Sequence, residues 1–413
     1  MKAVKILLLI VAVWCSCNSA FGQTWTQTGL SNVNWTCFAS SADGNTLVAE
    51  PTFLNGLIFI STNGGVTWNT NTLPSFYFSG TQYGMSFVSV ASSADGTKMA
   101  GVDVGGFICT STNSGTSWIT NNAPAVSWYS IASSTDGAKL VAVGGNGLGP
   151  IYVSTNSGVI WLPTIAPSNN WRSVASSADG TKLVAGCSGT NSIYVSTNSG
   201  NTWMTASTPT NKQWVVASSA DGTKMVAAYF SEPSTNSSGY APGHIFTSTD
   251  SGSTWGSNTL VSSFFGSVAM SADGSKIVAA TEDPVVFVST NFGGSWESNS
   301  LPGGGSYFQS VAMSADGGKL ITGSASLTLS LGGLGLSYMS QTVYAPQLNI
   351  SPVSNNLALS WIIPSTNFVL QQSADLISWV DLTNTPALNL TNLQNEVTLS
   401  PTNSVGFFRL STP

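Results

Sequence analysis

The sequence predicts an all-β chain built from seven similar four-stranded units, because one short phrase recurs seven times at a nearly constant spacing. The phrase is an apolar strand, an Ala-Asp-Gly or Thr-Asp-Gly turn and a second apolar strand, as in Ser173 to Val184. Successive repeats lie 41 to 43 residues apart, apart from two intervals of 52. This is the period of a propeller blade and is too long for a leucine-rich or ankyrin unit. We therefore expect a seven-bladed β-propeller, whose repeat aspartates are Asp43, Asp95, Asp136, Asp179, Asp221, Asp273 and Asp316.

A second phrase, Ser-Thr-Asn/Asp-x-Gly-x-x-Trp, occurs in fixed phase with the first. Its Asn or Asp side chain is expected to accept from backbone amides two residues on, and its Gly to take a positive φ. Its Trp begins the outermost strand. The phrase resembles the Asp-box, or BNR, repeat of sialidase-like propellers, although only Asp250 matches the family aspartate and Ile160 replaces the usual Thr or Ser. The six copies are Ser61–Trp68, Ser111–Trp118, Ser154–Trp161, Ser196–Trp203, Ser248–Trp255 and Ser289–Trp296.

The N-terminal residues supply a strand that the last repeat lacks. Trp25 lies 18 residues before the first repeat aspartate, the same distance that separates Trp161 from Asp179. The last repeat has no Ser-Thr-Asn phrase, and Gly335 to Gln341 stands in its place. We therefore expect Thr24 to Leu30 to be the outermost strand of the seventh blade, which removes the open edges of a linear array.

Residues 1–22 have the pattern of a secretory signal peptide. Two lysines precede an apolar stretch from Ile6 to Trp14, and Ala20 to Gly22 fits a small-x-small cleavage site. We expect cleavage after Gly22, a secreted or cell-surface protein and no membrane span in the mature chain. A lipoprotein anchored at Cys15 or Cys17 is the alternative, which the residues before these cysteines do not favour.

The propeller pattern covers residues 23–344, and residues 347–413 have a different one. Short apolar runs separated by Pro, Asn and Asp predict strands there. Leu370 to Trp379 and the terminal Phe407 to Leu410 resemble the small β module that ends many secreted bacterial proteins. The resemblance implies a β-sandwich-like accessory domain, to which we assign attachment or display.

The charge balance excludes nucleic acid as a partner. Without the two lysines of residues 1–22, 9 basic residues stand against 17 acidic ones, so no basic surface could neutralise phosphates. We interpret Cys37, Cys109 and Cys187 as buried strand residues, because their number is odd and their spacing is not that of a metal site. We expect no metal, no cofactor and a monomer.

The two faces of the propeller are expected to differ. The Asp-Gly turns and the Ser-to-Trp segments fall on one side, which we call the turn face; the loops between second and third strands, and the connections between blades, fall on the other, the loop face. We expect the repeat aspartates to be solvated hairpin tips. The same is expected of the lysines three residues further on, which are Lys98, Lys139, Lys182, Lys224, Lys276 and Lys319.

The loop face carries both insertions that lengthen the repeat. One, between Trp68 and Asp95, contains Tyr77 and Tyr83; the other, between Asp221 and Trp255, contains Tyr240 and the only histidine, His244, which we interpret as an ordinary surface residue. Carboxylates outside the repeat also gather on this face. They are Glu50, Asp103, Glu232, Glu282 and Asp283, and either solvated loop charges or an acid and base pair would explain them.

Aromatic residues stand at the start of the innermost strands. Packing between blades explains them, and so does partial exposure for stacking on a sugar or peptide. They are Trp35, Phe87, Trp128, Trp171, Trp214, Phe265 and Phe308.

Sialidase activity is not expected, although the resemblance suggests it first. Sialidases hold the substrate carboxylate with three arginines. This chain has two, Arg172 and Arg409, and the second lies in the C-terminal module. A glycoside hydrolase with an inverting carboxylate pair stays open, since it needs only two carboxyl groups ~6.5–9.5 Å apart. An assembly factor resembling the photosystem-assembly BNR propellers is disfavoured, because those propellers use arginine-rich patches.

The interpretation that we prefer is a secreted, non-catalytic propeller that binds a glycan or a protein on its loop face. The candidate ligand-binding residues are Trp35, Tyr77, Tyr83, Trp128, Trp171, Arg172, Trp214 and Tyr240.

Overall fold

The computed structural model describes residues 24–411, except for 31–32, 53–55, 79–80, 146, 190–192, 211, 231–242, 263–264, 282–284, 302–306, 326–334, 342–347, 354–355, 363–367, 375–376, 385, 390–392 and 401–406. The expected signal peptide lies outside these residues. Within them the chain is made of β-strands without a helix. The described part thus offers no helix of the length and apolarity that crossing a membrane requires.

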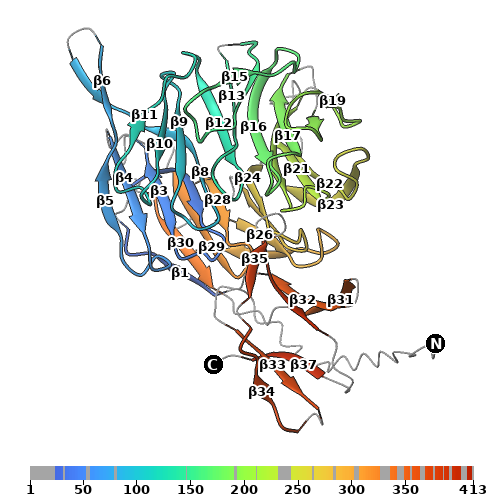
Figure 1. Ribbon diagram of the computed structural model, residues 1–413. Helices are drawn as coiled ribbons and strands as arrows, with labels where there is room; N and C mark the ends of the chain where they lie inside the picture. The colour runs from blue at the N-terminus through green and yellow to red at the C-terminus, as the bar shows by residue number, and fades with distance from the viewer. Residues whose placement is uncertain are drawn as a thin grey trace.

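Seven four-stranded antiparallel sheets follow one another along the larger part of the chain (Figure 1). We number them sheets 1 to 7 and give the innermost strand first. Sheet 1 consists of β2 (Trp35–Ser40), β3 (Leu47–Pro51), β4 (Leu57–Ser61) and β5 (Asn69–Thr72), and sheet 2 of β8 (Phe87–Ser92), β9 (Met99–Asp103), β10 (Ile108–Ser111) and β11 (Ile119–Thr120). Sheet 3 consists of β12 (Trp128–Ser133), β13 (Leu140–Gly144), β14 (Ile151–Ser154) and β15 (Leu162–Pro163), and sheet 4 of β16 (Asn170–Ser176), β17 (Leu183–Ser188), β18 (Ile193–Ser196) and β19 (Met204–Thr205).

Sheets 5 to 7 repeat this order. Sheet 5 consists of β20 (Gln213–Ser218), β21 (Met225–Phe230), β22 (Gly243–Ser248) and β23 (Gly256–Ser262), and sheet 6 of β24 (Phe265–Met270), β25 (Ile277–Thr281), β26 (Val285–Ser289) and β27 (Glu297–Ser300). Sheet 7 consists of β28 (Tyr307–Met313), β29 (Lys319–Ala325), β30 (Ser337–Gln341) and β1 (Trp25–Gln27).

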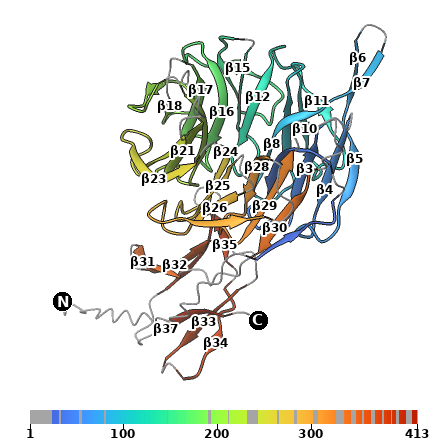
Figure 2. The same ribbon diagram turned by 180° about the vertical axis from the view of Figure 1, so that it is seen from behind.

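The N-terminal strand β1 joins the last sheet, as the position of Trp25 predicts. Trp25 lies opposite Ser340 and Gln27 opposite Tyr338 in an antiparallel pair. The strand ends at Gln27, earlier than the expected Leu30. The innermost strands contact one another in chain order, and β28 contacts β2. The sheets therefore form a closed ring, which Figure 2 shows from behind.

A circle of backbone hydrogen bonds surrounds the axis of this ring. The residue before each repeat aspartate donates its N–H to the carbonyl oxygen of its counterpart in the next sheet, over 2.7 to 2.8 Å. The last bond, from Ala315 to Ala42, closes the circle. Each of these polar groups is satisfied near the axis without water. The seven residues are Ala42, Ala94, Thr135, Ala178, Ala220, Ala272 and Ala315.

Each repeat turn is tied together by one serine and one aspartate. In the first turn, the Ser41 hydroxyl donates to Oδ1 of Asp43 over 2.6 Å and accepts from the Thr46 N–H over 2.9 Å. The same Asp43 oxygen accepts from the Asn45 N–H over 2.9 Å. Gly44 has a φ of 66°, which glycine adopts without strain. The other six turns repeat this pattern, which explains why the phrase recurs.

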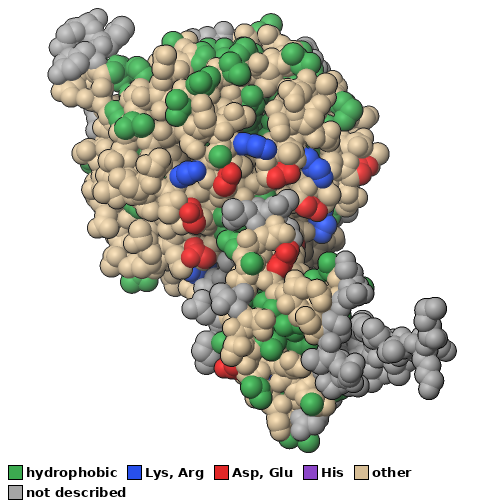
Figure 3. Space-filling model, viewed as in Figure 1, with side chains coloured by type: hydrophobic (Ala, Val, Ile, Leu, Met, Phe, Trp, Pro, Cys, Tyr) green, Lys and Arg blue, Asp and Glu red, His purple; other side chains and the backbone are tan. Residues whose placement is uncertain are grey.

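The repeat lysines reach the backbone or a side chain of the next sheet, a contact that the expectation of solvated hairpin tips did not include; for the buried Lys319 that expectation is wrong. Lys182 donates from Nζ to the carbonyl oxygen of Asp221 in the next sheet over 2.9 Å, and Lys98, Lys139, Lys224 and Lys276 do the same one sheet along. Lys319, with 7% exposure, donates to Oδ1 of Asn45 over 2.7 Å. Figure 3 shows these charged side chains around the centre of the turn face. We call each such contact a lysine strap.

The Ser-to-Trp segments form tight turns with a different bonding pattern from the one expected. Asn63 Oδ1 accepts from the Thr67 N–H, four residues on, over 2.9 Å. The Ser61 hydroxyl, rather than the Asn63 side chain, accepts from the amide two residues on, over 3.4 Å. Gly65 has the expected positive φ, and its carbonyl oxygen accepts from Nε1 of Trp68 over 3.1 Å. The indole thus fixes the start of the outermost strand.

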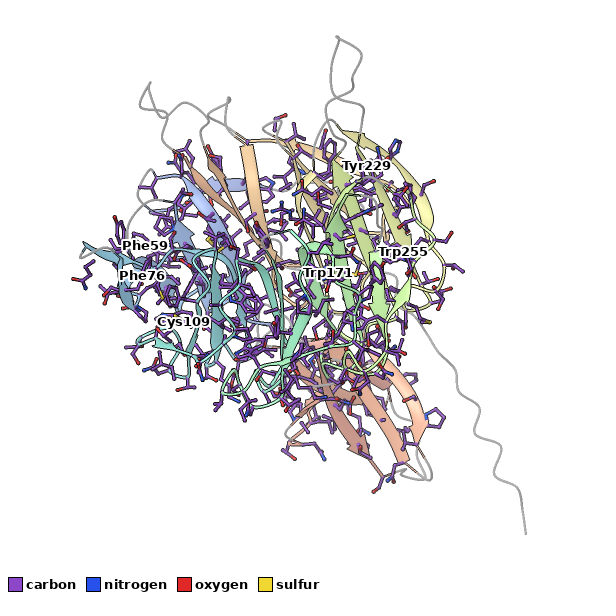
Figure 4. All side chains as sticks on the ribbon, turned by 90° about the horizontal axis from the view of Figure 1, so that it is seen from above. Phe59, Phe76, Cys109, Trp171, Tyr229 and Trp255 are labelled. Carbon is purple, nitrogen blue, oxygen red and sulfur yellow. The ribbon has the colours of Figure 1, made fainter. Side chains whose placement is uncertain are left out.

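The C-terminal residues form two small sheets with a common core. One consists of β31 (Asn349–Val353), β32 (Asn356–Ile362), β36 (Gln394–Leu399) and β35 (Ala387–Asn389), and the other of β34 (Val380–Asp381), β33 (Val369–Ser373) and β37 (Phe407–Ser411). Leu359, Trp361, Leu370 and Val397 are buried between them. Leu393 and Ile362 pack against the axial alanines, so this part of the chain lies on the turn face (Figure 4).

Candidate functional site

The ring of aromatic residues at the start of the innermost strands is buried. Trp35, Trp128, Trp171 and Trp214 have 0% exposure, as do Phe87 and Phe265. A Cβ added to Gly323 of sheet 7 would lie 2.9 Å from Cβ of Trp35, which shows how closely the neighbouring sheet approaches. The four tryptophans therefore pack between sheets, and the expectation that they bind a ligand is wrong. The side chain of Phe308 lies outside the described residues.

Two of the candidate carboxylates are buried and hold the backbone at the start of β8. Glu50 has 1% exposure and Asp103 has 6%. Glu50 Oε1 accepts from the Phe87 N–H over 3.0 Å, and Asp103 Oδ2 accepts from the Ser86 N–H over 3.3 Å. Asp103 Oδ1 also accepts from the Gly105 N–H. Loss of hydration raises the pKa of Glu50 well above its ordinary value, and it raises the pKa of Asp103.

These two residues are therefore not the solvated loop charges of the first interpretation. Nor is either placed to reach a substrate, because an acid and base pair must flank a scissile bond from an open cleft. The other three candidates, Glu232, Glu282 and Asp283, lie outside the described residues.

The first insertion forms a hairpin at the rim of the ring. It consists of β6 (Ser75–Phe78) and β7 (Thr81–Gly84), which project from sheets 1 and 2 in Figure 1. At its base Phe76 stacks on Tyr83 at 5.8 Å and lies 5.0 Å from the Phe107 ring, and Figure 4 shows Phe76 at the outer edge. Tyr83 keeps 42% of its surface exposed. Tyr77 lies in β6, but its side chain lies outside the described residues, as does Tyr240.

Arg172 lies at the loop-face end of β16, beside the axis. Its guanidinium carbon stands 4.2 Å from the centre of the Tyr129 ring, which belongs to β12 of the preceding sheet. Its Nε is buried without a hydrogen-bond partner. Among the residues that the structure describes, no carboxylate is paired with it. A guanidinium stacked on a tyrosine keeps its in-plane donors available for an acceptor.

A second cation lies on the same face, just before the innermost strand of the next sheet. Lys212 precedes β20 and its Nζ stands 4.9 Å from the centre of the Tyr229 ring. The Tyr229 ring lies 5.7 Å from His244 and 5.0 Å from Trp214, and loss of hydration raises the pKa of Tyr229. In an acidic chain, two cations held by tyrosines on one face favour an anionic group as ligand.

Sequence reasoning named Arg172 but missed Tyr129. A signal was available: both residues directly follow an aromatic ring residue in successive repeats, Trp128 and Trp171. Equivalent positions in neighbouring repeats lie side by side in a ring of sheets.

The turn face has a cavity of its own on the axis. It measures about 180 Å³ and is lined by the serines and alanines of the repeat turns, together with Met270, Met313 and Leu393. None of its lining residues is charged. In the part of the chain that is described, no three His, Cys, Asp or Glu residues lie together as metal ligands would. Cys37, Cys109 and Cys187 are buried.

No family model matches the chain, and no curated protein matches it. Solved structures do. A structure of YCF48 bound to a D1 peptide is 16% identical, with a TM-score of 0.54, and the match covers 78% of this chain and 97% of that one. YCF48 from Cyanidioschyzon merolae is 15% identical, with a TM-score of 0.55, covering 77% of this chain and 98% of that one.

A glycoside hydrolase is also similar. The Niastella koreensis GH74 enzyme is 14% identical with a TM-score of 0.54, and the match covers 82% of this chain and 59% of the enzyme. A sequence identity this low supports a shared fold but not a shared activity. The ring of antiparallel sheets and its likeness to these structures together identify the chain as a β-propeller.

Proposed function

We propose that this protein is a secreted, non-catalytic, seven-bladed propeller that binds a protein segment on its loop face. The pair formed by Arg172 and Tyr129 carries the proposal. Residues 1–22 would direct secretion, residues 23–344 would form the propeller, and residues 347–413 would be an accessory module for attachment or display. The protein would act as a monomer.

The chemistry of the pair favours a carboxylate as the group that it binds. A guanidinium offers two parallel N–H donors to a carboxylate, and partial burial strengthens such a contact relative to water. Lys212 adds a second positive charge on the same face. A peptide supplies carboxylates through Asp, Glu or its C-terminus.

A peptide fits better than a neutral glycan. Sugar binding would call for exposed aromatic platforms, and the four tryptophans that were candidates for that role have 0% exposure. A structurally similar propeller, YCF48, has been solved with a peptide bound. Tyr83, exposed on the hairpin β6–β7, could contact a longer ligand toward the rim.

Glycoside hydrolysis is the second candidate, because the GH74 enzyme shares the fold. It would depend on Glu232, Glu282 and Asp283, since Glu50 and Asp103 are buried against backbone amides. Release of reducing sugar from a polysaccharide panel, abolished by Asp283→Asn, would favour this candidate over the first.

A peptide array tests the binding proposal. Each peptide is present with a free C-terminal carboxylate and as its amide, and a second set replaces internal Asp and Glu by Asn and Gln. We expect binders to lose affinity when their carboxylate is removed. Arg172→Ala should weaken binding by about tenfold, the value of one lost charged hydrogen-bond pair.

Arg409→Ala is the matched control. Arg409 stacks on Trp379 at the same 4.2 Å, but in the C-terminal sheets. Binding should survive this change. Equal binding of acid and amide peptides, or equal losses in the two arginine variants, would contradict the proposal.

A further inference from the structure

The seams between successive sheets are held by two recurring side-chain contacts. The first is the lysine strap, which joins each of sheets 2 to 7 to the next sheet around the ring, sheet 7 being joined to sheet 1. The second is an inner-strand serine whose hydroxyl accepts from a backbone N–H of the next sheet, as Ser130 does from Val174 over 3.2 Å. We call it the serine clamp. Ser89, Ser173, Ser267 and Ser310 act in the same way.

The seam between sheets 1 and 2 has neither contact within the described residues. Thr46 occupies the position of the strap lysine, and Cys37 occupies that of the clamp serine. Cys37 instead donates from Sγ to the Phe87 carbonyl oxygen over 3.7 Å, a weak bond.

A buried carboxyl group of sheet 1 bonds to the backbone of sheet 2 at this seam. Glu50 Oε1 accepts from the Phe87 N–H across the seam, whereas Oε2 is buried without a hydrogen-bond partner. The titratable groups that face Glu50 are Cys37, its cross-strand partner on β2, and Asp103 on β9. Phe87, at the start of β8, and Ser86, just before it, are neutral hydrogen-bond partners of Glu50 that lower its pKa by less than burial raises it, and Cys109 of β10 lies beside Asp103. Within the described residues, no cation neutralises this group.

A protonated Glu50 can stay in this site, but an ionised one cannot do so at low cost. A buried carboxylate without a counter-ion costs several kcal/mol, which hydration would recover. With 1% exposure, Glu50 does not meet water while sheets 1 and 2 stay closed. We propose that the ring opens locally at the seam between sheets 1 and 2, and that ionisation of Glu50 drives the opening.

The direction of the pH dependence follows from burial. Desolvation raises the pKa of Glu50 well above 4.5, and the nearby Asp103 adds to this. A carboxyl group whose folded pKa is raised stabilises the closed seam fully below its ordinary pKa, and this stabilisation is lost as pH rises toward the folded pKa. Opening therefore increases with pH, by up to about tenfold per pH unit within that window.

Hydrogen exchange of the full chain, resolved by mass spectrometry and corrected for intrinsic rates, tests the proposal. The reporter is the Phe87 amide, and the controls are the amides of Ile131, Val174 and Val216, which the serine clamps hold. Protection of Phe87 should fall as pH rises, while protection of the three controls should not change. A Phe87 amide that follows the controls at every pH would overturn the proposal.

Two variants separate the carboxyl group from the missing strap. Glu50→Gln keeps the acceptor for Phe87 and cannot ionise, so protection should become independent of pH. Thr46→Lys adds the missing strap. Thr46 lies over Gly96 as Lys98 lies over Gly137, so a lysine at position 46 would occupy the position that the strap lysines occupy in the other sheets. It should raise Phe87 protection about tenfold at each pH and leave the pH dependence in place.

Each variant outcome decides the matter. If Glu50→Gln retains the pH dependence, another group causes it and the proposal is wrong. If Thr46→Lys leaves Phe87 protection unchanged, the missing strap is not what makes the seam open. Should Glu50→Gln fail to fold, the parent profile against its three control amides still gives the answer.

Discussion

Ala315 donates its backbone N–H to the carbonyl oxygen of Ala42 over 2.7 Å, which joins the last repeat turn to the first. Neither residue uses its side chain in this bond. Sheet 7 joins the two ends of the repeat array, because β1 pairs with β30 at its outer edge and β28 at its inner edge contacts β2 of sheet 1. Ring closure thus depends on the outermost and the innermost strand at once.

Removal of β1 should weaken closure. A chain that begins at Gly29 lacks the strand paired with β30 and leaves the edge of sheet 7 open. We expect a loss of several kcal/mol in unfolding free energy and faster aggregation, measured by urea denaturation and light scattering. Thr26→Ala, which keeps the backbone, is the control. A truncated chain that melts within about a degree of the parent would show that β1 does not close the ring.

A lysine strap should contribute measurably to stability. Lys182→Ala removes the bond to the Asp221 carbonyl oxygen, and we expect it to cost about 0.5–1.5 kcal/mol, the usual range for one hydrogen bond. Lys319→Ala should cost more, because Lys319 has only 7% exposure. Urea denaturation gives both values. Lys212→Ala, whose lysine has no strap, should stay within about 0.5 kcal/mol; a loss equal to that of Lys182→Ala would argue against the straps.

Trp171 and Tyr83 should behave in opposite ways. Trp171→Ala leaves a cavity between sheets and should cost about 3–5 kcal/mol. Tyr83→Ala removes a ring with 42% exposure and should cost about 1 kcal/mol or less. Thermal and urea unfolding measure both. A Trp171→Ala variant as stable as the parent would restore the tryptophans as candidates for ligand contact.

Asp250→Asn should change the acid side of the stability profile alone. Hydrogen bonds from Thr254 and Ser248 lower the pKa of Asp250 to about 2. Its contribution is therefore present above the ordinary pKa of 3.8 and is lost as pH falls through the folded value. Near neutral pH the variant should melt like the parent, since Asn63 makes the same backbone bond. Between about pH 4 and 2 the variant should lose less stability, and identical profiles in that range would contradict this account.

Much of the fold was accessible from spacing alone. The repeat period predicted the four-stranded sheets, and the distance from Trp25 to the first repeat aspartate predicted the pairing of β1 with β30. Both follow from counting, because a repeat array places equivalent residues at equivalent positions. The length of β1 was overestimated, because its pairing with β30 ends at Gln27.

The contacts between repeats could not be found in this way. A lysine three residues after an Asp-Gly turn is ordinarily solvated, and only the close approach of the next turn makes Lys182 reach the Asp221 carbonyl oxygen. Glu50 has the position of a loop carboxylate, yet the start of β8 covers it. The stacking of Arg172 on Tyr129 likewise depends on the distance between sheets, which no single repeat encodes.

The amides of the axial circle all point the same way around the axis, each sheet donating to the next. Peptide dipoles in a helix add along one line and leave partial charges at its ends. Dipoles arranged head to tail on a closed circle sum to zero. These seven amides therefore add no net dipole at the opening of the turn face, where the uncharged cavity lining and Leu393 of the C-terminal part meet.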